Sequence, residues 1–455
     1  MDKTGSTTPG PGSRPDTRGE IRTPFSRRKF LQAAGGGLAA LGAAPALAAC
    51  SGGPATSASS GGSGGSGGKN LRLLLWSHFV PAFDTYFDNY AKTWGQKNHI
   101  NVVVNHVPTQ TVVTHFSSEV AAGTGHDLVQ LQADTQPIIF APHLADVTDL
   151  HNKIGSENGG WIPLAQFGNV NGRWITIPEF FIEYPGIYRK DLFDSVGAPA
   201  PATFNDLITY GAELKKKGHP VGIGFSACDD SENAALGFMF AYGSTFIGKD
   251  GKTITFDSPE TRDALNEAKK LYTSAMTSEI LSWNDSSNNT YLDSGVASFI
   301  LNPISAYRSA PQSLQSKCDF VPPPAGSQKG ANTVTIQTWV IPKWSKAQDT
   351  AKKFLADYFA QYETAFKAST GYDMPFLNNF LKKPMPIIGT GKYQILQDAA
   401  SWSRGTGWPG PPTRQAGLVN DKYLMADVFA KYVTGQMNLN DAVSYGVGQL
   451  KSIYA

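Results

Sequence analysis

Beyond its first seventy residues, the chain alternates between short apolar runs and longer segments in which apolar residues recur every three or four positions. Leu71–Trp76 is typical of a buried strand, and Pro81–Lys97 carries aromatic residues along one side of a helix. Ile100–Val107 is rich in valine and predicts a second strand, and Thr109–Ala122 predicts a second helix. This alternation indicates an α/β fold with a mostly parallel sheet covered by helices.

The same pattern continues to the C-terminus. Further strands are predicted at Asp127–Leu131, Val296–Leu301 and Thr333–Ile341, and further helices at Thr203–Lys217, Glu260–Ser274, Lys346–Tyr362, Asp421–Val433 and Leu439–Ile453. Thr203 and Asp206 form a capping box, and Ser258-Pro259 is a typical helix start. Ligands of open α/β sheets bind beyond the carboxyl ends of strands, so residues that follow the predicted strands are the candidates for a binding site.

The first seventy residues are predicted to be a targeting signal and a linker and not part of the folded body. Ser26–Gln32 (SRRKFLQ) is a twin-arginine signature, and the apolar stretch that follows it is too short and too rich in small residues for a membrane-spanning helix. The stretch ends in Leu47–Cys50 (LAAC), which resembles a lipobox and predicts lipidation of Cys50. The alternative is a plain N-terminal anchor helix with a chance cysteine. Residues 1–50 are thus predicted to be a lipoprotein signal peptide, and the Gly/Ser-rich residues 51–69 a flexible linker.

Composition narrows the classes of partner. The 455 residues give room for two domains, and the formal charge is +2. Residues 1–30 hold seven bases and three acids, which leaves 32 bases and 34 acids for the rest. A nearly neutral body excludes nucleic acid as a partner. Three cysteines are present; one belongs to the lipobox, and Cys228 and Cys318 could pair or remain free thiols.

No motif for catalysis or for a cofactor is present. The histidines show neither HxxxH nor HExxH spacing, so no metal site is predicted. No phosphate-binding loop of the GxxxxGK[ST] kind and no GxSxG nucleophile motif occurs. The carboxylates are plentiful, but sequence alone assigns none of them as a catalytic acid–base pair.

Several segments resemble, in order, the bacterial extracellular solute-binding proteins of the maltose-binding type. They are Gly172–Pro178 (GRWITIP), Gly186–Phe193 (GIYRKDLF), Ala202–Leu207 (ATFNDL), Gly295–Asn302 (GVASFILN) and Thr335–Lys343 (TIQTWVIPK). The resemblance covers about residues 71–455. It implies a two-lobed periplasmic-binding-protein-like fold with hinge crossovers and a ligand cleft between the lobes. One lobe would be 70–181 plus 323–370, and the other 185–320 plus 375–455.

The resemblance also implies a function. The protein would be a monomer without cofactor, exported and lipid-anchored on the extracytoplasmic face of the membrane. It would bind a carbohydrate by closure of the cleft and deliver it to the permease subunits of an ABC importer, without acting as an enzyme. A polyamine or a glycerol-phosphate-type solute is the alternative ligand class. A surface-anchored glycoside hydrolase is a third hypothesis.

Sugars present hydroxyl groups at the rim and C–H groups on their faces, so aromatic and planar polar side chains complement them. The candidates are Trp76, His78, Asp134, Glu183, Tyr184, Asp229, Asp230, Trp283, Asn302, Gln337, Trp339, Arg404 and Trp408. Ordinary structural roles compete with these assignments. Tryptophans on strands can be core residues, and aspartates that precede helices can be caps. Where the family often has a tryptophan after Asn302, this chain has Ile304, which makes Trp283 the candidate replacement.

Overall fold

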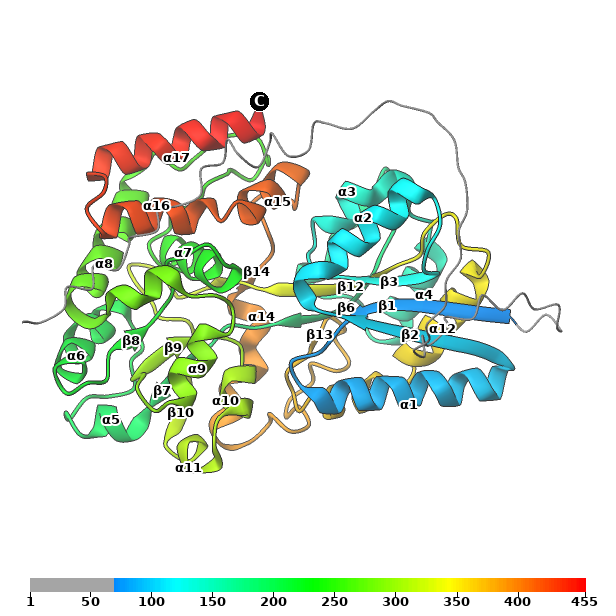
Figure 1. Ribbon diagram of the computed structural model, residues 1–455, viewed down its shortest axis with the longest axis horizontal. Helices are drawn as coiled ribbons and strands as arrows, with labels where there is room; N and C mark the ends of the chain where they lie inside the picture. Colours follow the sequence, from blue (N-terminus) through cyan, green and yellow to red (C-terminus); the bar gives the residue numbers. More distant parts are fainter. Residues whose placement is uncertain (1–68) are drawn as a thin grey trace, which may run out of the picture. The chain divides into compact units, whose positions relative to one another are not determined.

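The structure is a computed structural model that describes residues 69–455 (Figure 1). The predicted signal peptide, the lipidation residue Cys50 and the linker lie outside the described residues, apart from Lys69 at the end of the linker. Within the described body, no helix has both the length and the apolar character needed to cross a membrane. The body contains two main sheets, each with its own helices.

The larger sheet has six strands in the order β13-β6-β12-β3-β1-β2. They are β1 (Lys69–Trp76), β2 (Ile100–Val107), β3 (Leu128–Leu131), β6 (Ile177–Ile182), β12 (Thr335–Val340) and β13 (Met374–Pro375). Its helices are α1 (Pro81–Asn98), α2 (Val112–Ala122), α3 (Gln136–Phe140), α4 (Thr148–Glu157), α12 (Gln348–Phe359) and α13 (Tyr362–Ala368). Figure 1 shows α1 on one side of this sheet and α2 and α3 on the other.

The smaller sheet has four strands in the order β10-β7-β9-β8. They are β7 (Gly186–Arg189), β8 (Val221–Gly222), β9 (Phe299–Leu301) and β10 (Cys318–Val321). Its helices are α5 (Lys190–Asp194), α6 (Phe204–Lys216), α7 (Asp229–Ala241), α8 (Pro259–Ala275), α9 (Ser287–Asp293), α10 (Ser305–Ser309), α11 (Gln312–Gln315), α15 (Arg414–Asp421), α16 (Leu424–Val433) and α17 (Leu439–Tyr454).

Short elements join these layers. A two-residue hairpin pairs β4 (Asn169–Val170) with β5 (Arg173–Trp174), and β11 (Asn332–Thr333) runs parallel to β14 (Ser403–Arg404) beside α14 (Ala399–Trp402). Five 3₁₀ segments occur in the described body, at Thr109–Thr111, Ala141–His143, Pro163–Ala165, Ser278–Ser282 and Gly391–Asp398.

The two-lobed α/β fold is confirmed, but the prediction of mostly parallel sheets is wrong. β1 runs parallel to β2 and β3, whereas β12 is antiparallel to both of its neighbours. In the smaller sheet, only the β8–β9 pair is parallel. The reason is that β12 and β13 follow the smaller sheet in the chain and return from it to the larger sheet. Their direction is therefore not set by a strand–helix–strand unit.

Most local signals describe the helix ends correctly. Thr203 Oγ1 accepts a hydrogen bond from the Asp206 amide at 3.0 Å, and the Thr203 amide donates to the Asp206 carboxylate at 2.9 Å, which confirms the capping box. The predicted helix Lys346–Tyr362 ends instead at Phe359, and a new helix starts at Tyr362. The predicted helix Asp421–Val433 is interrupted by Tyr423, whose backbone is left-handed with φ of 50°.

The chain passes between the two lobes at three places: before β7, before β12 and after β13, which precedes the helices α15, α16 and α17 of the smaller-sheet lobe. The first two places lie next to each other. β6 ends at Ile182 and β7 starts at Gly186, while β10 ends at Val321 and β12 starts at Thr335. The predicted strand Thr333–Ile341 is therefore split at Val334, with β11 paired to β14 and β12 in the larger sheet. A Cβ atom on Gly186 would lie 2.6 Å from the Phe299 ring and 2.7 Å from Val321, so only glycine fits at this crossing.

Cys228 and Cys318 are buried free thiols, so the two do not form a disulfide bond.

Candidate ligand-binding cleft

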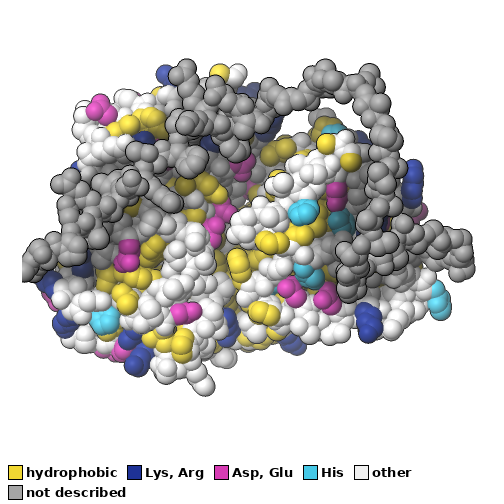
Figure 2. Space-filling model, in the orientation of Figure 1, with side chains coloured by type: hydrophobic (Ala, Val, Ile, Leu, Met, Phe, Trp, Pro, Cys, Tyr) yellow, Lys and Arg dark blue, Asp and Glu magenta, His cyan; other side chains and the backbone are white. Residues whose placement is uncertain are grey.

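A cavity of about 150 Å³ lies where the strand ends of the two sheets face each other. It is lined by Trp76, Phe79, Thr109, Ile182, Tyr184, Asp229, Asp230, Asp285, Ser286, Asn289, Asn302, Pro303, Ser305, Thr335, Gln337 and Tyr372. A wider cavity of about 530 Å³ shares Thr109, Asp229, Asp285 and Thr335 with it, so the two form one cleft. Figure 2 shows acidic side chains gathered in the groove between the lobes.

One wall of the cavity is aromatic. Trp76 is the last residue of β1, and its ring meets the edge of Phe79 with 5.3 Å between centroids. Phe79 is 53% exposed, which is unusual for a phenylalanine in the folded body. Tyr184 lies on the first crossing, and its hydroxyl is 3.2 Å from that of Thr335. Trp76 is only 3% exposed, so Phe79 presents most of the surface that can stack against the face of a flat ring, while the hydroxyls contact its rim.

The opposite wall carries carboxylates from the smaller-sheet lobe. Asp229 and Asp230 begin α7, and the Asp230 amide donates to the Asp285 carboxylate at 3.0 Å. Burial raises the pKa of Asp230, and the negative charge of Asp285 raises it further. The pKa of Asp229 is likewise raised, first because the surrounding protein excludes water and then by the charges of Asp285 and Asp421, although the Asp229 side chain opens to the cleft.

Asparagines hold this acidic wall in place. Asn288 on α9 donates from Nδ2 to Asp230 at 2.7 Å and also contacts the Asn302 side-chain oxygen. Asn302, which follows β9, in turn donates to Asn289 at 2.9 Å. Because each amide fixes its neighbour, the Asp230 carboxylate is positioned before any ligand arrives.

Gln337 on β12 is the polar group at the floor of the cavity. Its side chain is 0% exposed, and neither its oxygen nor its nitrogen has a hydrogen-bond partner among residues 69–455. Buried polar atoms are rarely left without partners, because an unmet amide costs free energy. A polar group at this place in the cavity suits a ligand that both donates and accepts hydrogen bonds.

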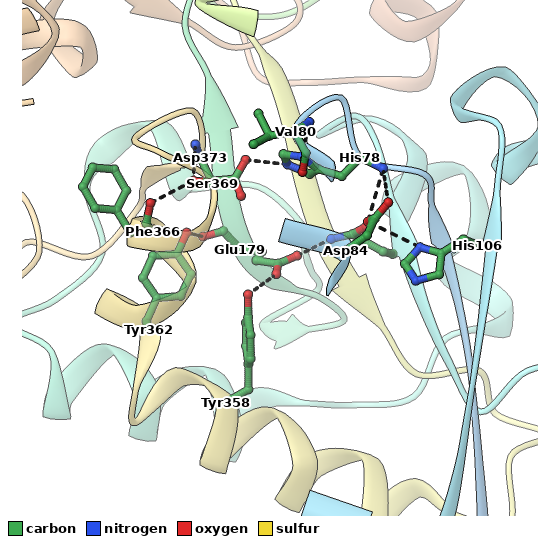
Figure 3. A network of polar contacts seen from close by, with 11 residues as sticks. His78, Val80, Asp84, His106, Glu179, Tyr358, Tyr362, Phe366, Ser369 and Asp373 are labelled. Atoms are coloured by element: carbon green, nitrogen blue, oxygen red, sulfur yellow. Dashed lines mark hydrogen bonds and ion pairs between the residues drawn. The ribbon is translucent and has the colours of Figure 1, made fainter. Parts of the chain in front are cut away.

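A polar network lies behind the aromatic wall (Figure 3). The Val80 amide donates to His78 Nδ1 at 2.8 Å, which places the proton on Nε2, and Nε2 donates to Asp373 at 3.0 Å. The His78 ring stacks on Phe83, and its backbone amide donates to Asp84 at 3.0 Å. These contacts fix the turn that follows Trp76, so His78 acts on the cavity through the position of that turn.

The sequence pattern of the bacterial extracellular solute-binding proteins matches residues 80–361, which is more than half of the chain. The chain belongs to this family. Members of this family are exported from the cytoplasm and bind solutes, so the chain has a substrate-binding role outside the cytoplasm. Among curated proteins, no sequence matches the chain.

Solved structures share the two-lobed fold of this solute-binding protein. MalE3 from T. maritima, determined with maltose, is 19% identical with a TM-score of 0.72, over 84% of this chain and 99% of that one. A solute-binding protein from Thermotoga lettingae, bound with α-D-tagatose, is 18% identical with a TM-score of 0.73, over 85% and 100%. The GacH receptor of Streptomyces glaucescens, studied with acarbose, is 16% identical with a TM-score of 0.71, over 86% and 99%.

Six of the sequence-predicted residues line the smaller cavity of this solute-binding protein together: Trp76, Tyr184, Asp229, Asp230, Asn302 and Gln337. His78 does not line the cavity and lies behind the aromatic wall. Glu183 lies next to Tyr184 but is 0% exposed, lines none of the cavities described here and leaves both carboxylate oxygens without a partner in the described body. Burial raises the pKa of Glu183 well above its ordinary range, so the group is held there as a neutral acid.

The structure places the remaining candidates away from that cavity. Trp339 is 0% exposed and stacks on Phe87 with 5.8 Å between centroids, in the core of the larger-sheet lobe. Trp283 packs edge-on against Tyr291 beneath β8. Asp134 does not cap α3 but accepts a hydrogen bond from the Thr406 amide at 2.9 Å.

Asp134, Arg404 and Trp408 line a different cavity of about 670 Å³. There the Arg404 guanidinium lies 5.0 Å from the centre of the Trp408 ring. This cavity is separated from the aromatic wall of the cleft and contacts the wider part of the cleft only through Thr406.

Sequence reasoning does not single out Asp285 or Tyr372 as candidates. Asp285 lies in the polar loop between Ser282 and α9, and the density of polar residues around it is the only signal that could have found it. Tyr372 precedes β13, a two-residue strand that has no recognisable pattern of its own. Within residues 69–455, no three His, Cys, Asp or Glu side chains come close enough together to hold a metal ion.

Proposed function

We propose that this protein binds a carbohydrate in the cavity between its lobes and delivers it to the permease subunits of an ABC importer. The observation that carries the proposal is the pairing of an aromatic wall with a wall of carboxylates and amides. Trp76 and Phe79 face Asp229, Asp285 and Asn302 across one cavity. A pyranose ring needs both surfaces, since its faces are apolar and its rim is made of hydroxyls.

The two walls belong to different lobes, and this arrangement supports binding by closure. Trp76 and Gln337 come from the larger sheet, whereas Asp229 and Asn302 come from elements of the smaller sheet. A ligand that contacts both sets stabilises the closed arrangement over the open one, and only this difference in affinity can drive closure. The crossings near Gly186 and Val334, together with the crossing beside β13, would be the hinge, between lobes made of 70–181 plus 323–370 and of 185–320 plus 375–455.

We also propose where in the cell the protein acts. The twin-arginine signature and the lipobox would export the chain and anchor it through lipid on Cys50, and residues 51–69 would tether the monomeric body above the membrane. The similar structures from T. maritima, Thermotoga lettingae and Streptomyces glaucescens hold maltose, tagatose and acarbose, which supports a carbohydrate here. No lysine or arginine lines the smaller cavity, which disfavours glycerol phosphates as the ligand.

A thermal-shift panel tests this proposal. The purified protein is heated with glucose, maltose, cellobiose, laminaribiose, glucosamine, spermidine and glycerol 3-phosphate. At least one sugar is expected to raise the melting temperature, because a ligand at 100 times its dissociation constant adds about 2.7 kcal/mol to stability.

A sugar hit that is recovered unchanged after incubation supports a binding protein. Release of glucose from a disaccharide would contradict the proposal in favour of a hydrolase. A shift with spermidine or glycerol 3-phosphate and with no sugar would contradict it in favour of the other solute classes.

A further inference from the structure

The acidic wall of the cleft has more carboxyl groups than neutral sugar hydroxyls require. Asp229, Asp230 and Asp285 all line the smaller cavity, and Asp421 lines the wider part of the cleft beside them. None of these four carboxylates forms an ion pair with a lysine or arginine of the described body. Arg414 lines the wider part of the cleft, while the smaller cavity has no basic residue in its lining.

Asp230 and Asp285 have hydrogen-bond partners within the cleft wall, but local structure does not account for Asp229. Acids at the start of a helix are common, because they interact favourably with its N-terminal amides. Glu232 in the first turn of α7 nevertheless turns away from the cleft and accepts hydrogen bonds from the Met425 and Ala426 amides. The Asp229 carboxylate accepts no hydrogen bond from any residue of the described body and opens to the cleft.

Neighbouring carboxylates also raise the pKa of Asp229 and of Asp230. After burial, the charge of Asp285 is the largest cause of the raised pKa of both Asp229 and Asp230. Like charges held this close destabilise the empty cleft, and a cation placed among them removes the repulsion.

An independent observation indicates that a polar ligand occupies the same cavity. Gln337 is fully buried, lines the cavity from the opposite lobe and has neither of its polar atoms paired. Its amide can pair with a hydroxyl or an amine of a ligand. Trp76 and Phe79 beside it give the ligand an apolar surface against which a sugar ring can stack.

We propose that the carbohydrate bound in this cavity is an amino sugar, whose ammonium group lies against the Asp229 and Asp285 carboxylates while its ring stacks on the Trp76 wall. This inference rests on the proposed carbohydrate function and specifies the class of sugar. An ammonium donates three hydrogen bonds and carries the charge that a hydroxyl lacks, and such charge-assisted bonds are about twice as strong as neutral ones.

Titration calorimetry with matched sugars tests the inference. Cellobiose and its 2,2′-diamino analogue, β-1,4-linked diglucosamine, differ only in two amino groups. Diglucosamine is expected to bind at least about tenfold more tightly than cellobiose at low salt, with the preference reduced at high salt. The Asp229→Asn/Asp285→Asn double variant, which keeps side-chain size, is expected to reduce the preference to about threefold or less.

Asp149→Asn is the matched control, because Asp149 is an exposed aspartate in the first turn of α4, outside the cleft. It is expected to leave the preference unchanged.

The outcomes separate this inference from the function on which it rests. Equal affinity for cellobiose and diglucosamine, or binding of neutral sugars only, would overturn the inference and leave carbohydrate binding intact. Equal affinity for diglucosamine and its N,N′-diacetyl derivative would also overturn it, because the acetylated nitrogen carries no charge. Spermidine bound more tightly than every sugar would overturn both proposals.

Discussion

Replacement of Gln337 by leucine is expected to stabilise the ligand-free protein and, at the same time, to weaken sugar binding. Gln337 is fully buried with both polar atoms unpaired, and leucine has nearly the same volume. Removal of a buried, unpaired amide is expected to raise the free energy of unfolding by about 1–3 kcal/mol. Loss of two hydrogen bonds to the ligand is expected to weaken binding by about 10- to 100-fold.

Urea denaturation without ligand and calorimetry with the tightest-binding sugar of the panel measure the two effects. Gln312→Leu on α11 is the control, since Gln312 is exposed and outside the cleft, and it is expected to change neither quantity appreciably. A purely structural Gln337 would produce destabilisation in the Gln337→Leu variant. Unchanged affinity would remove Gln337 from the binding site.

The second large effect concerns pH and the buried Glu179 on β6. Glu179 is 1% exposed, accepts a hydrogen bond from the Tyr358 hydroxyl at 2.8 Å and contacts the Gln130 side chain. Burial raises the pKa of Glu179 to about 8, with a further contribution from the Asp373 charge. The folded protein therefore holds a proton on Glu179 at a pH at which the unfolded chain has released it.

Stability should consequently fall as the pH rises from about 4.5 toward 8, because unfolding then releases a proton. One such proton changes the free energy of unfolding by about 1.4 kcal/mol for each unit of pH. Glu232, whose pKa is raised to about 8 by burial, adds an effect of the same sign. The protein is therefore expected to be more stable at pH 5.5 than at pH 8.

Glu179→Gln should remove the contribution of Glu179 to this pH dependence, because glutamine stays neutral at every pH. The glutamine side chain can still accept the hydrogen bond from the Tyr358 hydroxyl. The difference in unfolding free energy between pH 5.5 and pH 8 is expected to shrink by about 2–3 kcal/mol, as measured by denaturant titration at both values. Glu213→Gln on the exposed face of α6 is the control and should leave the difference unchanged. An undiminished difference in Glu179→Gln would show that Glu179 is ionised in the folded state.

Local sequence signals were sufficient for most of the fold. The capping box at Thr203, the Ser258 N-cap and the apolar run of β1 depend on residues close in the chain, and all three form as predicted. The direction of β12 depends on the path of the chain through the other lobe. Periodicity carries no information on that path, so the prediction of mostly parallel sheets failed there.

The site was predicted less completely, for a related reason. Strand ends pointed to Trp76 and Asn302, and both line the smaller cavity, because the ends of strands meet at one edge of a sheet. Alternation predicts that Trp339 shares a face of β12 with Gln337. The pairing of β12 with β6 is irregular between Gln337 and Thr338, and Trp339 lies in the core, where it stacks on Phe87. Asp285 reaches the cleft only through the packing of its loop against α7, a contact between residues distant in sequence.

Small-angle X-ray scattering tests the central claim most directly, because the claim is that two lobes close on a sugar. The radius of gyration is measured for the purified protein alone and with a saturating amount of the panel sugar that gives the largest thermal shift. The account predicts a smaller radius of gyration with that sugar and the unbound value with a sugar that gives no shift. The same radius of gyration in all three samples would contradict binding by closure of the cleft.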